Sequence, residues 1–142
     1  MVHYYKVNCT RDNLKLIREF VYSVLRNLSL SEIEINQLVL AVDEVCSNLI
    51  IHSHQCNPDN AIEINIHHLP ELVLFEIIDN DASAFDISNY KNPSINKIMK
   101  ERRKGGMGLI LVNKIMDAVE VKNEKTQNIW RMSKHIPPRS VH

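Results

Sequence analysis

The chain uses glycine at one place only. It contains three glycines in 142 residues, and all three fall within four positions, at Gly105, Gly106 and Gly108. A sequence that builds every other turn without glycine needs the missing side chains at this one place, either because the backbone takes positive φ or because another molecule approaches it closely. The apolar residues that follow, LILVNKIMDAV (109–119), have helical spacing. KGGMGL (104–109) therefore opens a helix whose N-terminal N–H groups could hold a phosphate; the alternative is a plain turn that leads into a helix.

The composition is that of an ordinary globular domain. Lys and Arg number 17 against 17 Asp and Glu, and this neutral balance argues against a dedicated nucleic-acid-binding protein. The apolar runs are too short to span a bilayer, and the N-terminus lacks the apolar segment of a secretory signal. The three cysteines, Cys9, Cys46 and Cys56, lack the paired spacing of a disulfide framework. We therefore expect one soluble, cytoplasmic domain over residues 1–142.

The spacing of apolar residues predicts where the elements lie. Helical spacing runs over residues 11–28, and Ser31 with Glu34 forms a capping-box pattern that begins a second, longer helix. Alternation over 62–66, a turn, and an apolar run over 72–79 indicate an antiparallel hairpin. The other expected elements are an edge strand at 2–8, a helix at 109–119 and final strands at about 119–124 and 128–134. This order is typical of an α+β two-layer sandwich with helices on one face of a mostly antiparallel sheet.

Residues 80–104 lack a sustained period and form a long expected loop. Loops of this length inside a compact domain are usually functional or mobile. Five cations gather near its end, just before the glycines: Lys97, Lys100, Arg102, Arg103 and Lys104. They could screen phosphate charge, although a run of charge more commonly marks a solvated face.

Glu44, Asn48 and His52 lie four residues apart, on one stripe of the second helix. A carboxylate and a carboxamide on one stripe could hold a hard cation and activate a hydroxyl, or they could simply form a solvated polar face. Asp79 ends the second hairpin strand, where its carboxylate could accept hydrogen bonds from the edge of a nucleobase or begin an Asx turn.

His52, His54 and Cys56 alternate along the chain and suggest a zinc-linked sensor as a more distant possibility. The stretch lacks the paired ligand spacing of structural zinc sites. Surface histidines at a helix end are the preferred interpretation, here and at His67-His68 near the hairpin turn.

Three motifs, taken in order, resemble those of the bacterial anti-sigma factor serine kinases, a branch of the GHKL superfamily that includes gyrase, histidine kinases and MutL. AVDEVCSNLIIH (41–52) is similar to the family's N-box, FEIIDNDASAFD (75–86) to the box whose Asp contacts the adenine amino group, and GGMGLILVNKIMDAVEV (105–121) to its glycine box. The loop at 80–104 then takes the place of the mobile ATP lid. The resemblance covers nearly the whole chain.

The resemblance implies a Bergerat-type, histidine-kinase-like ATPase fold and an ATP- and Mg²⁺-dependent protein serine kinase that regulates transcription by partner switching. Its general base would be Glu44, and its magnesium ligand Asn48. The residues it implies around the nucleotide are Asn48, Asp79, Arg103, Lys104, Gly105, Gly106 and Gly108. The implied partners are a sigma factor and a small antagonist protein that carries the target serine; a homodimer is also expected.

The second box departs from the family pattern. The family has glycine two residues after the adenine-contacting Asp, and this chain has Asp81 there, with Phe85 and Asp86 one residue further along than expected. The kinase is the favoured interpretation, and an acidic side chain where backbone approaches a nucleotide keeps one alternative open, a non-catalytic partner-binding module on the same fold that binds nucleotide weakly or not at all.

Overall fold

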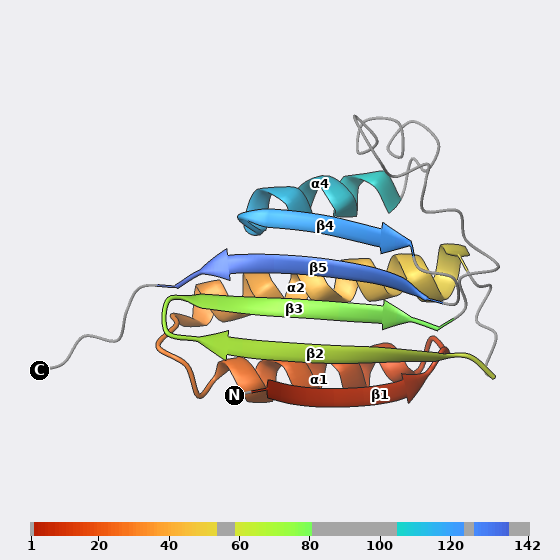
Figure 1. Cartoon of the computed structure of the whole chain (residues 1–142), viewed down its shortest axis with the longest axis horizontal. Coiled ribbons are helices and arrows are strands. Elements are labelled where there is room, and N and C mark those ends of the chain that lie inside the picture. Colours follow the sequence, from red (N-terminus) through yellow and green to blue (C-terminus); the bar gives the residue numbers. More distant parts are fainter. Residues whose placement is uncertain (1, 54–58, 81–104, 124–126, 137–142) are drawn as a thin grey trace, which may run out of the picture.

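The computed structural model describes residues 2–53, 59–80, 105–123 and 127–136 (Figure 1). Within them the protein is a two-layer sandwich, a five-stranded antiparallel sheet with helices on one face. The expected α+β class is confirmed. None of the helices in these ranges is long and apolar enough to cross a membrane.

The sheet has the strand order β1-β2-β3-β5-β4, and every neighbouring pair is antiparallel. The expected hairpin is confirmed, because β2 and β3 pair in a register that sets Ile62 opposite Asp79. The first strand lies at an edge, as its sequence predicts. The strands are β1 (Val2–Asn8), β2 (Ala61–Leu69), β3 (Leu72–Asp79), β4 (Ala118–Asn123) and β5 (Asn128–His135).

The capping box is present at the start of the long helix, α2 (Glu32–Ser47). The Ser31 hydroxyl accepts a hydrogen bond from the Glu34 N–H, and the Glu34 carboxylate accepts one from the Ser31 N–H, both at 3.1 Å. One turn of π-helix, η1 (Asn48–Ser53), continues α2.

Two helices differ from the prediction at both ends. The helix expected over 11–28 is shorter, α1 (Asn13–Leu25), and at its end the N–H groups of Asn27 and Leu28 donate to carbonyls three residues back instead of four. The helix expected over 109–119 is α4 (Gly105–Ile115) and begins at the glycines. It ends earlier because Asp117 is tied to β5, through its N–H to the Ser133 carbonyl and its carboxylate to a backbone N–H.

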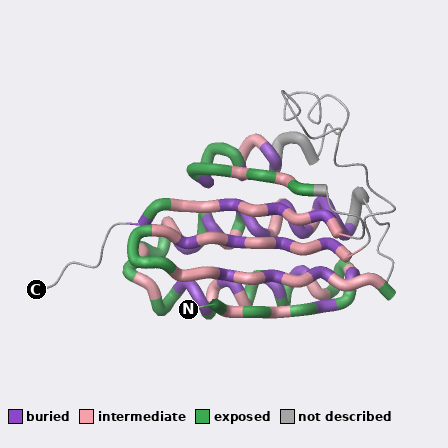
Figure 2. Tube along the Cα trace, in the orientation of Figure 1, coloured by how far each residue is buried: buried purple, intermediate pink, exposed green. Residues whose placement is uncertain are grey.

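The core lies between the sheet and the helices (Figure 2). Alternate strand residues are buried, and helix α2 packs against both α1 and α4. The fully buried large side chains are Phe75, Ile17, Leu25, Leu38, Leu49, Ile50, Ile62, Ile64, Ile66, Ile77 and Met132.

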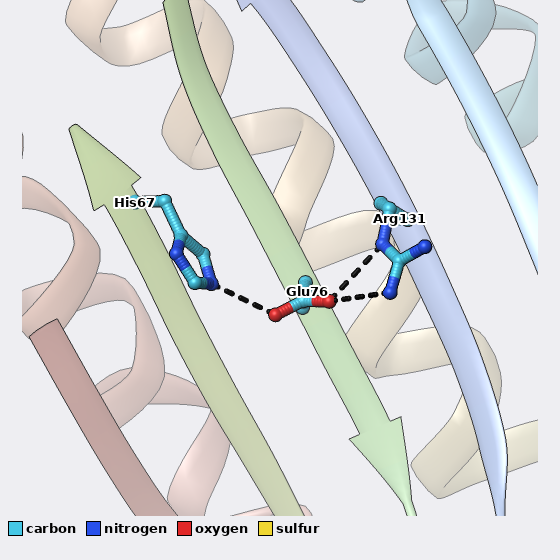
Figure 3. A network of polar contacts seen from close by, with 3 residues as sticks. All are labelled: His67, Glu76 and Arg131. Atoms are coloured by element: carbon cyan, nitrogen blue, oxygen red, sulfur yellow. Dashed lines mark hydrogen bonds and ion pairs between the residues drawn. The ribbon is translucent and has the colours of Figure 1, made fainter. Parts of the chain in front are cut away.

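No described helix covers the outer face of the sheet, and this face carries a polar network (Figure 3). Glu76 on β3 accepts hydrogen bonds from His67 Nε2 on β2 at 2.8 Å and from Arg131 Nε and Nη2 on β5 at 3.0 and 2.8 Å. Burial acts to raise the pKa of Glu76, but the hydrogen bonds from Arg131 and His67 outweigh it and the pKa is lowered. The three central strands are thus joined by side chains as well as by their backbones.

Candidate active site

The candidate residues gather at one end of the sandwich. The last turn of α2 with η1, the end of β3, the start of β5 and the start of α4 all lie at the end that Figure 1 shows on the right. Because α2 packs against α4, the glycine-containing turn and the polar stripe of α2 belong to adjoining helices. The fold thus brings together three motifs that are far apart in the sequence.

Asn48 is a buried polar residue at the junction of α2 and η1, with only 4% of its surface exposed. Its Nδ2 donates to the Glu44 backbone carbonyl at 2.7 Å. Its Oδ1 is buried without a hydrogen-bond partner among the described residues. A buried acceptor left without a partner costs about 1–3 kcal/mol, and carboxamide oxygens are among the ligands that Mg²⁺ accepts. The side chain therefore fits a hard cation. The π-helix η1, which begins at this residue, is a kind of element often found at functional sites.

Glu44 lies one helical turn before Asn48 and is half-buried. Burial is the main cause that raises the pKa of its carboxyl, and the negative charge of Asp43 adds to the effect. Asp43 is itself held by Arg18, whose Nη1 lies 3.1 Å from Asp43 Oδ1. A carboxylate with a raised pKa is a stronger proton acceptor, as a general base requires.

Asp79 and Asn128 form the last pair of the β3–β5 ladder, on the face that the helices cover. Asp79 is 1% exposed and Asn128 is fully buried. Both Nδ2 and Oδ1 of Asn128 are buried with no hydrogen-bond partner in the described part of the chain. A carboxylate beside an unused carboxamide offers the acceptors and donors that the edge of a nucleobase needs.

Asn128 is a residue that the sequence prediction missed. The predicted strand over 128–134 begins at Asn128, but a polar residue that directly follows a turn segment does not by itself indicate a buried site. The available signal was the alternation of the last strand, which places Asn128 on the same buried face as Trp130 and Met132.

All three glycines lie in the first turn of α4, with Gly105 as its first residue. The N–H groups of a first helical turn have no partner within the helix, and they carry the positive end of the helix dipole. Glycine lets an anion approach these N–H groups closely.

The other candidate residues fall outside this description. Asp81, Arg103 and Lys104, with nearly all of the expected lid, lie outside the described residues, as do His54 and Cys56. Within the described residues no group of three or more His, Cys, Asp or Glu side chains could hold a metal ion.

The comparisons with known proteins agree with one another on the family. The profile of the histidine kinase-like ATPase domain matches residues 7–134. The chain is similar to the serine-protein kinase RsbW of Bacillus cereus, with 24% identity over 141 residues that cover 96% of this chain and 86% of that protein. It is also similar to RsbW of Halalkalibacterium halodurans, with 25% identity over 113 residues, 77% of this chain and 68% of that protein.

Two solved structures share the fold at 12% sequence identity. The structure of the RsbU and RsbW domains of Rv1364c from Mycobacterium tuberculosis matches with a TM-score of 0.67 and covers 100% of this chain; the match spans 35% of that longer chain. The SiaB–SiaC complex from Pseudomonas aeruginosa matches with a TM-score of 0.58, over 94% of this chain and 89% of the other.

Proposed function

The chain belongs to the histidine kinase-like ATPase domain family, and from this premise we propose that it is an ATP- and Mg²⁺-dependent protein serine kinase of the anti-sigma factor type. The observation that carries the proposal is the buried Asn48 Oδ1, which has no partner among the described residues and lies one turn from a carboxyl of raised pKa. A base and an unused cation ligand on one helical stripe are the two parts that activation of a hydroxyl beside Mg²⁺·ATP requires.

In this proposal Asn48 holds Mg²⁺, and the ion supplies neutralisation of phosphate charge when it is bound. Asp79 and Asn128 receive the adenine, with Asp79 accepting a hydrogen bond from its amino group. The N–H groups of Gly105, Gly106 and Gly108 hold the phosphates. Arg103 and Lys104 add positive charge next to them.

The proposed transfer step uses Glu44 as the general base. The Glu44 carboxylate accepts the proton of the incoming serine hydroxyl, and the serine oxygen forms a bond to the γ-phosphorus. The bond between the γ-phosphorus and the bridging β–γ oxygen breaks, and ADP leaves with that electron pair. Most of the rate enhancement in phosphoryl transfer comes from positioning and charge stabilisation, so a site with few groups suffices.

The wider assignment follows the relatives. We propose a single domain over residues 1–142 with an ATP lid at 80–104, acting in the cytoplasm. Its proposed partners are a sigma factor and an antagonist protein that carries the target serine, and the kinase acts as a homodimer in this transcription-regulating switch. The names of the similar serine-protein kinases support the kinase activity and its serine target. The sigma factor, the homodimer and the lid follow from the family resemblance.

Calorimetry with ATP and with ADP, each with and without Mg²⁺, tests nucleotide binding directly. We expect ATP to bind, and to bind more tightly with Mg²⁺. Transfer is then followed from γ-³²P-labelled ATP to protein serine in an extract of the cells of origin, with Glu44→Gln as the matched control. Labelling that is equal for both proteins would contradict the kinase assignment.

A second candidate function rests on Asp81, which stands where the family pattern has glycine. A carboxylate near a polyphosphate opposes binding, so the same fold could serve as a partner-binding module without catalysis. Calorimetry separates the two, because the module would show no Mg²⁺-dependent ATP binding.

A further inference from the structure

A set of hydrogen bonds on the outer face of the sheet fixes the end of β3 beside the candidate site. Asn80 follows Asp79; its Nδ2 donates to Glu63 Oε2 at 2.9 Å, and its Oδ1 accepts from Gln127 Nε2 at 2.9 Å. Its backbone N–H also donates to the Ala61 carbonyl at 3.3 Å. One residue therefore joins the ends of β2 and β3 to the residue that precedes β5.

Each residue of the Asn80–Gln127 pair, on the outer face of the sheet, is a sequence neighbour of a site residue on the inner face. Asp79 immediately precedes Asn80, and Asn128 immediately follows Gln127. Neighbouring side chains on a strand point to opposite faces, and accordingly Asp79 and Asn128 are buried while Asn80 and Gln127 are partly exposed. The bond between Asn80 and Gln127 therefore restrains, from the outer face, the spacing of Asp79 and Asn128 on the inner face.

This end of the sheet needs such a restraint. Asp79 and Asn128 are the final pair of the β3–β5 ladder. The end of a ladder has fewer backbone hydrogen bonds than its centre and opens more readily. A binding side chain must stay within roughly 0.5 Å of its productive position, so side-chain bonds beyond the last ladder pair have a direct effect on the site.

Glu63 anchors the set to β2 and, through Tyr4, to β1. The Tyr4 hydroxyl donates to Glu63 Oε1. The pKa of Glu63 is lowered, first by the hydrogen bond from Tyr4, then by that from Asn80, with the positive charge of Lys6 adding against the opposing effect of burial. An ionised carboxylate only accepts hydrogen bonds, and it accepts them strongly, so Glu63 holds the Asn80 amide in one orientation.

We propose that Asn80 is a positioning residue of the nucleotide site, which holds Asp79 and Asn128 at the spacing at which they contact the nucleobase. The inference rests on the proposed function, because it assumes that Asp79 accepts a hydrogen bond from the 6-amino group of adenine. Asn80 itself lies on the opposite face of the sheet and acts only through its neighbours.

The test compares ATP with purine riboside triphosphate, which lacks the 6-amino group, by calorimetry on the full chain with Mg²⁺. The wild type should bind ATP roughly tenfold more tightly, or better, because a hydrogen bond to a carboxylate is lost with the analogue. Asn80→Ala should weaken ATP binding about fivefold and weaken binding of the analogue less, because the analogue has only the contact with Asn128 to lose. Gln127→Ala removes only the bond between Gln127 and Asn80, so it should weaken ATP binding by less than Asn80→Ala does. This variant replaces Asn80→Ala in the test if Asn80→Ala does not fold.

Glu76→Gln is the matched control. Glu76 also joins β3 to β2 and β5 by side-chain bonds on the outer face, but it does so at the middle of the sheet (Figure 3). A merely stabilising role for outer-face bonds would make this variant behave like Asn80→Ala. We expect both of its nucleotide affinities to match those of the wild type.

Three results would overturn the inference. Equal changes in the two affinities for Asn80→Ala, or no change in either, would remove the positioning role and leave the proposed function standing. A further fivefold loss of ATP affinity when Asn80→Ala is added to Asp79→Asn would show that Asn80 does not act through Asp79. A wild type that binds neither nucleotide would end the proposed function, and the inference with it.

Discussion

Replacing Asn48 with leucine should stabilise the nucleotide-free protein and remove its Mg²⁺-dependent affinity for ATP. The side chain is 4% exposed and its Oδ1 has no partner among the described residues. Removing such an acceptor returns about 1–3 kcal/mol of free energy of unfolding. Leucine has the same number of side-chain heavy atoms as asparagine and the same branch at Cγ, so the change opens no cavity, but its larger volume offsets part of this gain.

One favourable bond is lost in exchange. Asn48 Nδ2 donates to the Glu44 carbonyl, and a neutral bond of this kind contributes about 0.5–1.5 kcal/mol. The carbonyl is not left without a donor, because the backbone N–H of Asn48 also donates to it. The net expectation is a gain of at most about 1 kcal/mol, which raises Tm by up to about 3 °C in a chain of this length.

The assay is thermal unfolding with and without Mg²⁺·ATP. At a hundredfold excess over Kd the nucleotide stabilises the wild type by about 2.7 kcal/mol, or about 8 °C, and Asn48→Leu should show almost none of that shift. Asn36→Leu, at an exposed position of the same helix, measures the change in helix propensity alone. If Asn48→Leu is less stable than Asn36→Leu by 1 kcal/mol or more, Oδ1 has a favourable partner in the folded protein and the reasoning is wrong. A full nucleotide shift in Asn48→Leu would show that Asn48 is not the magnesium ligand.

Other substitutions test the remaining parts. Glu44→Gln should keep ATP binding while transfer falls about 10²–10⁴-fold, and Asp43→Asn, which removes a charge that raises the pKa of Glu44, should move the acidic limb of the pH–rate profile to lower pH. Gly106→Val should abolish nucleotide binding, by calorimetry, in a protein with unchanged circular dichroism, because its side chain blocks the approach of phosphate. Glu76→Gln should lower the free energy of unfolding at pH 7 by about 1–2 kcal/mol in urea titrations. Because the pKa of Glu76 is lowered from 4.5, this difference should shrink as the pH falls below that value. Asp81→Gly should tighten ATP binding if Asp81 lies near the polyphosphate, and unchanged affinity would place Asp81 away from it.

The sequence predicted the elements well where one buried face imposes a period. Alternation located β2 because every second side chain enters the core, and an apolar run located β3. The capping box located the start of α2 because its hydrogen bonds are local. Helix ends were predicted less well. The end of α4 depends on Asp117, which bonds to β5, and no local pattern in the sequence reports a contact with a strand that follows later.

The sequence likewise predicted some features of the candidate site and missed others. The four-residue spacing of Glu44 and Asn48 predicted a shared stripe, but each such step rotates about 40° around the helix. That rotation carries Asn48 into the core beside Leu49 and leaves Glu44 half-exposed, so the structure assigns the two residues different environments that the spacing alone does not. Asn128 is the opposite case, since its burial follows from the strand register that sets it beside Asp79. Both asparagines carry buried polar atoms, Oδ1 of Asn48 and the whole carboxamide of Asn128, that the described chain leaves without partners, which breaks the rule that buried polar atoms are hydrogen-bonded. Sites at which a fold breaks its own rules are where a ligand is expected, because a ligand can return the lost hydrogen bonds. That two such sites occur at the same end of the sandwich as the glycine turn is, in physical terms, the strongest reason to look for a nucleotide there.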